Sequence, residues 1–143
     1  MARVLVIDDD RALTLAIRIR LQAAGFEVTI AYDARTGSQL AIRERPDVIL
    51  LDVDMPHFSG SELHECLKYS GRARLIPVVY LSGNDSISTR AAAFRSGARA
   101  FITKPYDCAS LIQTLRDAIA EAHITSEPQL ESEHVRCGGE SVK

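Results

Sequence analysis

Four short apolar segments of this 143-residue chain end in polar side chains whose types could do chemistry together. The first segment is followed by Asp8 and Asp9, the second by Asp52, the third by Ser82 and the fourth by Lys104. Carboxylate oxygens are the ligands that Mg²⁺ prefers, whereas an ammonium group and a hydroxyl are donors suited to phosphoryl oxygens. The residue types therefore indicate a site for magnesium and a phosphoryl group.

The apolar segments themselves have the character of strands that are buried on both faces of a parallel sheet. Each is short and rich in Val, Ile or Leu, as such strands are. The segments are Val4–Ile7, Val48–Leu51, Val78–Leu81 and Phe101–Thr103. In an open parallel sheet, functional groups gather just outside the carboxyl ends of the strands. We therefore expect the polar residues to meet at one edge of the sheet.

Strands and helices are predicted to alternate five times. The predicted strands are Arg3–Ile7, Phe26–Ala31, Val48–Leu51, a strand opened by Pro77, and Arg99–Thr103. The predicted helices are about Arg11–Ala24 with Asp10 as N-cap, Asp33 to about Arg45, Ser61–Tyr69, Asn84 or Asp85 to Ser96, and a last helix capped by Asp107 with the apolar stripe Leu111, Ile112, Leu115 and Ile119. Gly25 and Pro46 end the first two helices. Five such units with short connections predict a doubly wound α/β sandwich.

Composition narrows the class of protein. Hydrophobic content of 46%, charged content of 25% and a net charge of −2 are typical of a globular protein and argue against a strongly basic nucleic-acid surface. No apolar stretch approaches the ~20 residues that span a bilayer, and the early first strand leaves no room for a signal peptide. Three cysteines without a C-x-x-C pair favour reduced thiols and a cytoplasmic location.

The chain after residue 123 loses its apolar periodicity. Ser, Glu, Pro and Gly dominate the segment that begins at Ile124, so residues 124–143 are predicted to be a disordered tail. Residues 1–123 would then form the one folded domain. The tail is too short to hold a second folded domain.

Each polar residue at the strand ends also has an ordinary structural explanation. The acidic run that begins at Asp8 could only cap a helix, Lys104 could be a solvent lysine, and Ser82 could end a strand at a turn. Their occurrence at successive strand ends favours a joint site instead. In that site Asp9 and Asp52 are candidate Mg²⁺ ligands, and Asp52 is a candidate nucleophile that could carry a phosphoryl group as an acyl phosphate.

With these residues in place, the chain resembles the receiver domains of two-component response regulators over about Arg3–Ala122. The matching motifs are VLVIDD at 4–9, PDVILLDVDMP at 46–56, Gly60, LSG at 81–83 and KP at 104–105. The resemblance implies a flavodoxin-like (βα)₅ fold with strand order 2-1-3-4-5 and a cis Lys104–Pro105 bond. It implies that Asp52 is phosphorylated from a sensor histidine kinase or a histidine phosphotransfer protein, and that the chain catalyses only its own phosphorylation and dephosphorylation.

The resemblance also implies the ligands of the metal. Mg²⁺ would be held by Asp9, Asp52 and the backbone carbonyl of Asp54, with Asp8 acting through water. An acid at 54 and the side chain of Asn84 would flank the phosphoryl group and could affect its hydrolysis in either direction.

A switch is implied as well. In such domains the hydroxyl at the Ser82 position moves toward the phosphoryl group while the aromatic side chain at the Phe101 position turns inward. A target protein would read this change at the surface formed by the fourth helix, fifth strand and fifth helix. Simple core packing is the alternative role for Phe101, which lacks the phenol oxygen of a Tyr.

Two other functions stay open on the sequence. Asp52-Val53-Asp54 is similar to the D-x-D signature of haloacid-dehalogenase-type phosphatases, although that signature ordinarily ends the first strand. A receiver-like adaptor that works without phosphorylation is the second alternative. His57 and His64 could be metal or phosphotransfer residues, but a loop position and a helix position explain them more simply.

Overall fold

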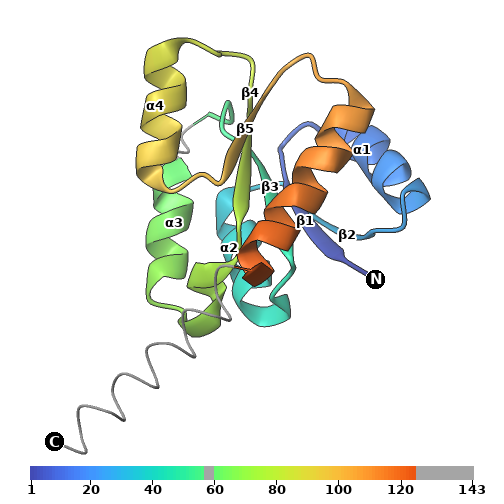
Figure 1. Ribbon diagram of the computed structural model, residues 1–143. Helices are drawn as coiled ribbons and strands as arrows, with labels where there is room; N and C mark the ends of the chain where they lie inside the picture. Colours follow the sequence, from blue (N-terminus) through green and yellow to red (C-terminus); the bar gives the residue numbers. More distant parts are fainter. Residues whose placement is uncertain (57–59, 125–143) are drawn as a thin grey trace, which may run out of the picture.

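Five parallel strands form one sheet in the order β2-β1-β3-β4-β5, as the resemblance predicted (Figure 1). The computed structural model describes residues 1–56 and 60–124. The strands are β1 (Arg3–Ile7), β2 (Glu27–Ala31), β3 (Val48–Asp52), β4 (Val78–Ser82) and β5 (Ala100–Thr103). Both the doubly wound α/β class and the strand order are confirmed.

Helices cover both faces of the sheet (Figure 1). They are α1 (Arg11–Ala23), α2 (Ala34–Glu44), α3 (Gly60–Lys68), α4 (Ile87–Ser96) and a C-terminal helix described over residues 108–124; a short 3₁₀ helix, η1 (Gly71–Leu75), precedes β4. One apolar core lies between the sheet and α2, α3 and α4, and the other lies between the sheet and α1 with the C-terminal helix.

The alternation of side chains along β1 divides its residues between the two cores. Leu5 and Ile7 pack on the side of α2 to α4, whereas Val4 and Val6 pack on the side of α1. Successive side chains of a strand point to opposite faces, so an apolar run is what a strand covered on both sides requires. The central strands β1, β3 and β4 are accordingly the most buried.

The caps predicted for three helices are confirmed. Asp10 accepts a hydrogen bond from the Leu13 N–H (3.0 Å), and Asp33 accepts one from the Thr36 N–H (2.7 Å). Asp107 accepts one from the Ser110 N–H (3.0 Å). These bonds satisfy amide groups that have no partner within the first turn of a helix.

The start of α4 was predicted too early. The helix begins at Ile87 with Ser86 as its cap, and Ser86 accepts the Thr89 N–H at 3.2 Å. Asn84, one of the two predicted starts, is used in the preceding loop instead, where its side-chain oxygen accepts the Ser86 N–H at 3.1 Å. Both residue types are good caps, so the sequence did not distinguish them.

Other boundaries differ by a residue or two. Asp52 and Ser82 are the last residues of β3 and β4 instead of following them, and η1 was not predicted. Ile124 still belongs to the C-terminal helix. The rest of the predicted tail and His57 lie outside the described residues. Among the described helices, none has the length and apolar character to cross a membrane.

The C-terminal helix is expected to be an integral part of the domain. Leu115 is fully buried in the core that this helix shares with α1. Leu115→Ala should lower the free energy of unfolding by about 2–5 kcal/mol, because it removes buried methyl groups and leaves a cavity. Urea unfolding, with the denaturant slope as a check on two-state behaviour, measures this.

The matched control is Ile19→Ala on α1, where the side chain is 57% exposed. Its effect should stay within about 0.5 kcal/mol. Equal effects of the two substitutions would show that the C-terminal helix is not docked on the sheet.

Candidate functional site

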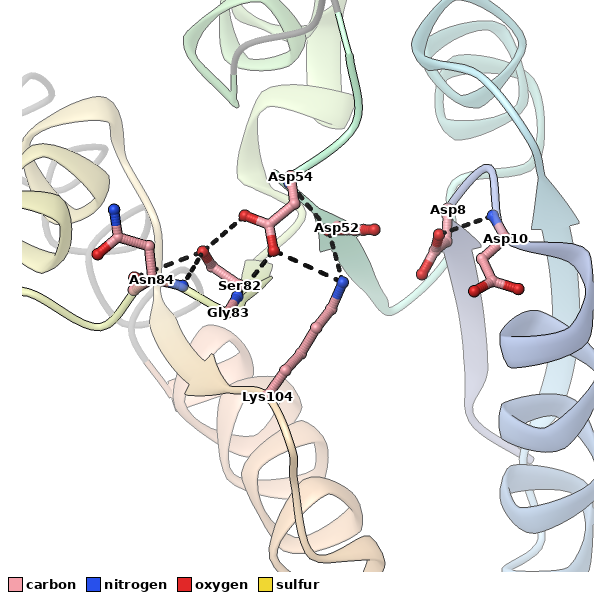
Figure 2. Close-up of polar contacts among 8 residues, drawn as sticks. All are labelled: Asp8, Asp10, Asp52, Asp54, Ser82, Gly83, Asn84 and Lys104. Atoms are coloured by element: carbon pink, nitrogen blue, oxygen red, sulfur yellow. Dashed lines mark hydrogen bonds and ion pairs between the residues drawn. The ribbon is translucent and has the colours of Figure 1, made fainter.

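The polar residues singled out from the sequence lie together at one edge of the sheet (Figure 2). Asp8 directly follows β1, Asp52 and Ser82 end β3 and β4, and Lys104 directly follows β5. In-register parallel pairing brings these ends to one level: Asp52 pairs with Leu81, and Ser82 with Thr103. The predicted meeting of the strand ends is therefore confirmed.

A shared local geometry orients three of these side chains. The Asp8 carboxylate accepts the N–H of Asp10 (2.9 Å), and Asp52 accepts the N–H of Asp54 (2.9 Å). The Ser82 hydroxyl oxygen accepts the N–H of Asn84 (3.0 Å). Bonds from a short polar side chain to the backbone two residues later are typical of turns. The backbone therefore turns after each of these strands, and the hydrogen bond holds the polar side chain in a defined position.

Three carboxylates form a cluster that fits a divalent cation. Oxygens of Asp8, Asp9 and Asp52 all lie within 4.8 Å of one another. Asp8 and Asp52 are only 1% and 5% exposed, whereas Asp9 is exposed. Within residues 1–56 and 60–124, Asp8 Oδ2 is buried and has no hydrogen-bond partner. A buried oxygen of this kind is costly unless a cation or donor satisfies it, and oxygen ligands at a solvent-accessible edge suit Mg²⁺.

Burial has a marked effect on Asp8. Loss of solvent, reinforced by the neighbouring Asp52 charge, raises the pKa of Asp8 to about 7, against the opposing effects of the Asp10 N–H and Lys104. Burial disfavours the charged form of a carboxyl group, and a second carboxylate adds to this. Near neutral pH and without a cation, the Asp8 carboxyl group is therefore protonated in part of the molecules.

The Asp52 carboxylate also forms an ion pair with Lys104. The Nζ atom lies 3.1 Å from Asp52 Oδ1, the same oxygen that accepts the Asp54 N–H. Burial by itself would lower the pKa of Lys104, but the hydrogen bond to Asp52 and the surrounding acidic charges raise it overall. The Lys104 N–H donates to the Ser82 carbonyl (2.8 Å), and the predicted cis Lys104–Pro105 bond is present.

This arrangement is chemically suited to a carboxylate nucleophile. Asp52 has the Lys104 ammonium group beside one oxygen, and it belongs to the carboxylate cluster that forms the candidate metal site. Positive groups fixed around a reacting carboxylate stabilise the charge of an incoming phosphoryl group and of the transition state.

The side chain of Asp54 is the main feature that the sequence did not reveal. Its carboxylate accepts the Ser82 hydroxyl at Oδ1 (2.8 Å) and the Gly83 N–H at Oδ2 (2.7 Å). Lys104 Nζ lies 3.7 Å from Oδ2. The sequence had assigned a role to the backbone carbonyl of Asp54 and had placed its acid beside the phosphoryl group, but it did not predict the bonds to Ser82 and Gly83. The available signal was an acid two residues after Asp52, opposite a hydroxyl at the end of the neighbouring strand.

The bonds to Asp54 stabilise its charged form. Burial alone would raise the pKa of Asp54, but the Gly83 N–H, the Ser82 hydroxyl and Lys104 together lower it. The carboxylate is therefore an anion at neutral pH, and it bridges the ends of β3 and β4 (Figure 2).

Phe101 lies on β5 beside Tyr80 in the register of the sheet. Its half-buried ring packs against the core beneath α2 to α4, and the Arg90 guanidinium carbon lies 4.8 Å from the ring centroid. Arg90 also donates to the Thr103 hydroxyl at 3.3 Å. Phe101 thus joins β5 to α4, and packing and switching are both compatible with this position.

His64 is not part of the site. It lies on α3, with its ring stacked on Tyr80 at a centroid distance of 5.8 Å. Burial lowers the pKa of His64. The structure gives it a packing role between α3 and the sheet, as the helix position had suggested.

Comparison with known proteins agrees with this geometry. The family model of the response regulator receiver domain matches residues 4–116. RpaA of Synechocystis, a DNA-binding dual master transcriptional regulator, is 35% identical over 116 residues, which are 81% of this chain and 48% of RpaA. The response regulator MprA of Mycolicibacterium vanbaalenii is 36% identical over 114 residues, 80% of this chain and 48% of MprA.

The chain spans about half the length of these curated relatives. Among solved structures, the chemotaxis protein CheY4 of Vibrio cholerae superposes with a TM-score of 0.77 at 30% identity. That match covers 82% of this chain and 98% of CheY4. The matched region of this chain therefore corresponds to nearly the entire CheY4 chain.

Mg²⁺ affinity should increase with pH. A cation that uses the acidic cluster must displace the proton held by Asp8, whose pKa is about 7. Between about pH 6 and about pH 8 the deprotonated fraction of such a group rises roughly tenfold, and so should the association constant. Isothermal titration calorimetry in two buffers with different ionisation enthalpies measures both the affinity and the proton release.

Asp8→Asn should bind Mg²⁺ more weakly and lose most of this pH dependence. Asp10→Asn should keep it, because Asn caps a helix as well as Asp does and Asp10 is outside the cluster. An affinity of the parent protein that is constant or falls across this range would contradict the assignment of the proton to Asp8.

Proposed function

The chain belongs to the response regulator receiver domain family, and from that membership we propose that Asp52 accepts a phosphoryl group in two-component signalling. The observation that carries the proposal is the position of the Asp52 carboxylate. It lies between Lys104, at 3.1 Å, and the cluster formed with Asp8 and Asp9. The phosphoryl donor is a phosphohistidine of a sensor kinase or of a histidine phosphotransfer protein.

In the reaction, an Asp52 oxygen attacks the phosphorus of the phosphohistidine. The new O–P bond forms as the P–N bond breaks, and the released imidazole takes up a proton. Lys104 provides a positive charge for the phosphoryl oxygens, and Ser82 and the Gly83 N–H provide hydrogen-bond donors. The chain catalyses only its own phosphorylation and dephosphorylation at Asp52.

The residues that would hold Mg²⁺ are Asp9, Asp52 and the backbone carbonyl of Asp54, with Asp8 acting through water. The buried and unpartnered Asp8 Oδ2 supports this assignment. When bound, Mg²⁺ neutralises charge on the phosphoryl oxygens. The haloacid-dehalogenase alternative does not agree with the family of the chain, and its D-x-D motif here ends the third strand.

The output is proposed to be a change of protein contacts, with residues 1–123 as the receiver unit. Ser82 ends β4, and Phe101 lies on β5, which contacts α4. A shift of Ser82 toward the phosphoryl group would alter the packing of Phe101, and a target protein would read the surface of α4, β5 and the C-terminal helix. This region itself is proposed to contact neither nucleic acid nor membrane.

Labelling tests the proposal. Incubation with acetyl phosphate or a cognate phosphohistidine and Mg²⁺ should attach one hydroxylamine-sensitive phosphoryl group per chain, because acyl phosphates react with hydroxylamine. Asp52→Asn should abolish the label, as measured by intact mass. The control Asp117→Asn removes an exposed acid on the C-terminal helix and should label normally.

Full labelling of Asp52→Asn would place the acceptor elsewhere. Turnover of a generic phosphomonoester by the parent protein would instead identify a phosphatase.

A further inference from the structure

We propose that the Asp54 carboxylate is an internal competitor of the phosphoryl group: at rest it occupies the Ser82 hydroxyl and the Gly83 N–H, and phosphorylation of Asp52 must displace it. The inference rests on the proposed function of Asp52. It adds a residue that sets how readily the phosphorylated state forms and where Ser82 lies before it forms.

The contacts of Asp54 are those of a bound anion. Each oxygen of the carboxylate accepts one short hydrogen bond, from the Ser82 hydroxyl at 2.8 Å and from the Gly83 N–H at 2.7 Å. The Gly83 bond is shorter than the usual N–H···O distance of about 2.9–3.0 Å, as is typical of bonds to an ionised acceptor. With Lys104 Nζ at 3.7 Å, the carboxylate has a cation and two donors around it, as a phosphoryl group would need.

The two anions cannot use these donors at the same time. The Ser82 hydroxyl and the Gly83 N–H each have a single proton to donate. The Ser82 oxygen is further fixed by the Asn84 N–H at 3.0 Å, so it is not free to rotate without losing that contact. A phosphoryl group on Asp52 therefore gains these donors only when Asp54 gives them up.

Charge acts in the same direction. A phosphoryl group carries about −1.5 to −2 charges near neutral pH, and Asp54 is an anion two residues from its point of attachment. Like charges at such short range repel, and Lys104 would have to be shared among the phosphoryl group, Asp52 and Asp54. The charge on Asp54 thus disfavours the phosphorylated state, beyond the loss of donors.

Displacement is nevertheless feasible because Asp54 is not enclosed. Its side chain is 40% exposed, in contrast to 6% for Asp52. A carboxylate at the surface can exchange protein donors for water at small net cost. The Asp54 carboxylate can therefore leave the Ser82 and Gly83 donors and be solvated, whereas the Asp52 carboxylate stays buried in the site.

The contact also sets the resting position of Ser82. The bond to Asp54 directs the hydroxyl toward the end of β3 before any phosphoryl group is present (Figure 2). Removal of the carboxylate should release Ser82 and Gly83 in the unphosphorylated chain as well. This gives a readout that does not depend on phosphorylation.

The test uses beryllofluoride with Mg²⁺ as the phosphoryl mimic, on the full chain and its Asp54→Ala and Asp54→Asn variants. Asp54→Ala should bind the mimic about tenfold more tightly, since two charge-assisted bonds no longer compete. Asp54→Asn keeps an acceptor oxygen but no charge, and should fall between the parent and Asp54→Ala. Titrations followed by amide chemical shifts give the midpoints.

The matched control is Asp85→Asn, which removes an exposed acid from the loop between β4 and α4, close in sequence to Ser82 and Gly83. No described hydrogen bond or ion pair joins Asp85 to Ser82, Gly83 or Lys104. Its midpoint should match that of the parent protein. An equal gain in Asp85→Asn and Asp54→Asn would show a general charge effect and overturn the proposal.

A double-mutant cycle isolates the shared donor. In a Ser82→Ala background, Asp54→Ala should tighten binding of the mimic less than it does in the parent background, because one of the contested donors is gone. A full tenfold gain in that background would show that Ser82 is not contested.

The unphosphorylated state separates failure of this inference from failure of the proposed function. In an Asp52→Asn background without the mimic, Asp54→Ala should shift the Gly83 amide resonance and speed its hydrogen exchange. If the parent protein binds the mimic but neither Asp54 variant binds it more tightly, the competition is wrong and the phosphoacceptor role stands. If neither parent nor variants bind the mimic, both are overturned.

Discussion

The concentration of carboxylates at one edge of the sheet is the constraint to which the rest of the site responds. Asp8, Asp9, Asp52 and Asp54 follow or end the adjacent strands β1 and β3, and Lys104, which follows β5 on the far side of β4, places its ammonium group beside Asp52 and Asp54. Buried acids repel one another and lose their hydration. The negative charge of each of the four carboxylates is stabilised in a different way, and these differences indicate which acid binds a cation and which acid reacts.

Exposure and hydrogen bonding separate the four acids. Asp9 stays in solvent, and Asp54 takes donors from β4. Asp52 has the ammonium group of Lys104, whereas Asp8 keeps one buried oxygen without a partner and has its pKa raised to about 7. Groups on β4 and after β5 therefore balance the negative charge of Asp52 and Asp54. Among the described residues, no such group balances the charge of Asp8 beside β1. A cation is needed only beside β1, where the three-carboxylate cluster lies.

The parts of the structure that the sequence predicted well are those governed by strong local signals. Apolar runs such as Val48–Leu51 predicted central strands because a strand covered on both faces has few other compositions. Caps at Asp10 and Asp33 were predictable because each precedes a helical pattern directly. The convergence of Asp52 and Lys104 followed from topology alone, since parallel strands share an edge for their carboxyl ends.

The parts that were missed depend on choices between similar side chains. Asn84 and Ser86 are both good helix caps, and only the loop geometry after β4 decides between them. The bridge from Asp54 to Ser82 joins residues 28 positions apart, so no local pattern reports it. Strand order placed both residues at the same edge, but the direction of a side chain in a turn is set by its hydrogen bonds and could not be read from spacing.

The core beneath α2, α3 and α4 connects this edge of the sheet with the surface of α4. Tyr80 and Phe101 are paired in the register of β4 and β5 and pack in the same core, and Ser82 and Thr103 end these strands as the next pair along the same face. Arg90 of α4 contacts both the Phe101 ring and the Thr103 hydroxyl. Packed interiors transmit small shifts because they contain little free volume. A movement of Ser82 would therefore act on α4 through the paired strands β4 and β5 and through Arg90. Asp54 contacts Ser82 directly, at the beginning of this series of contacts.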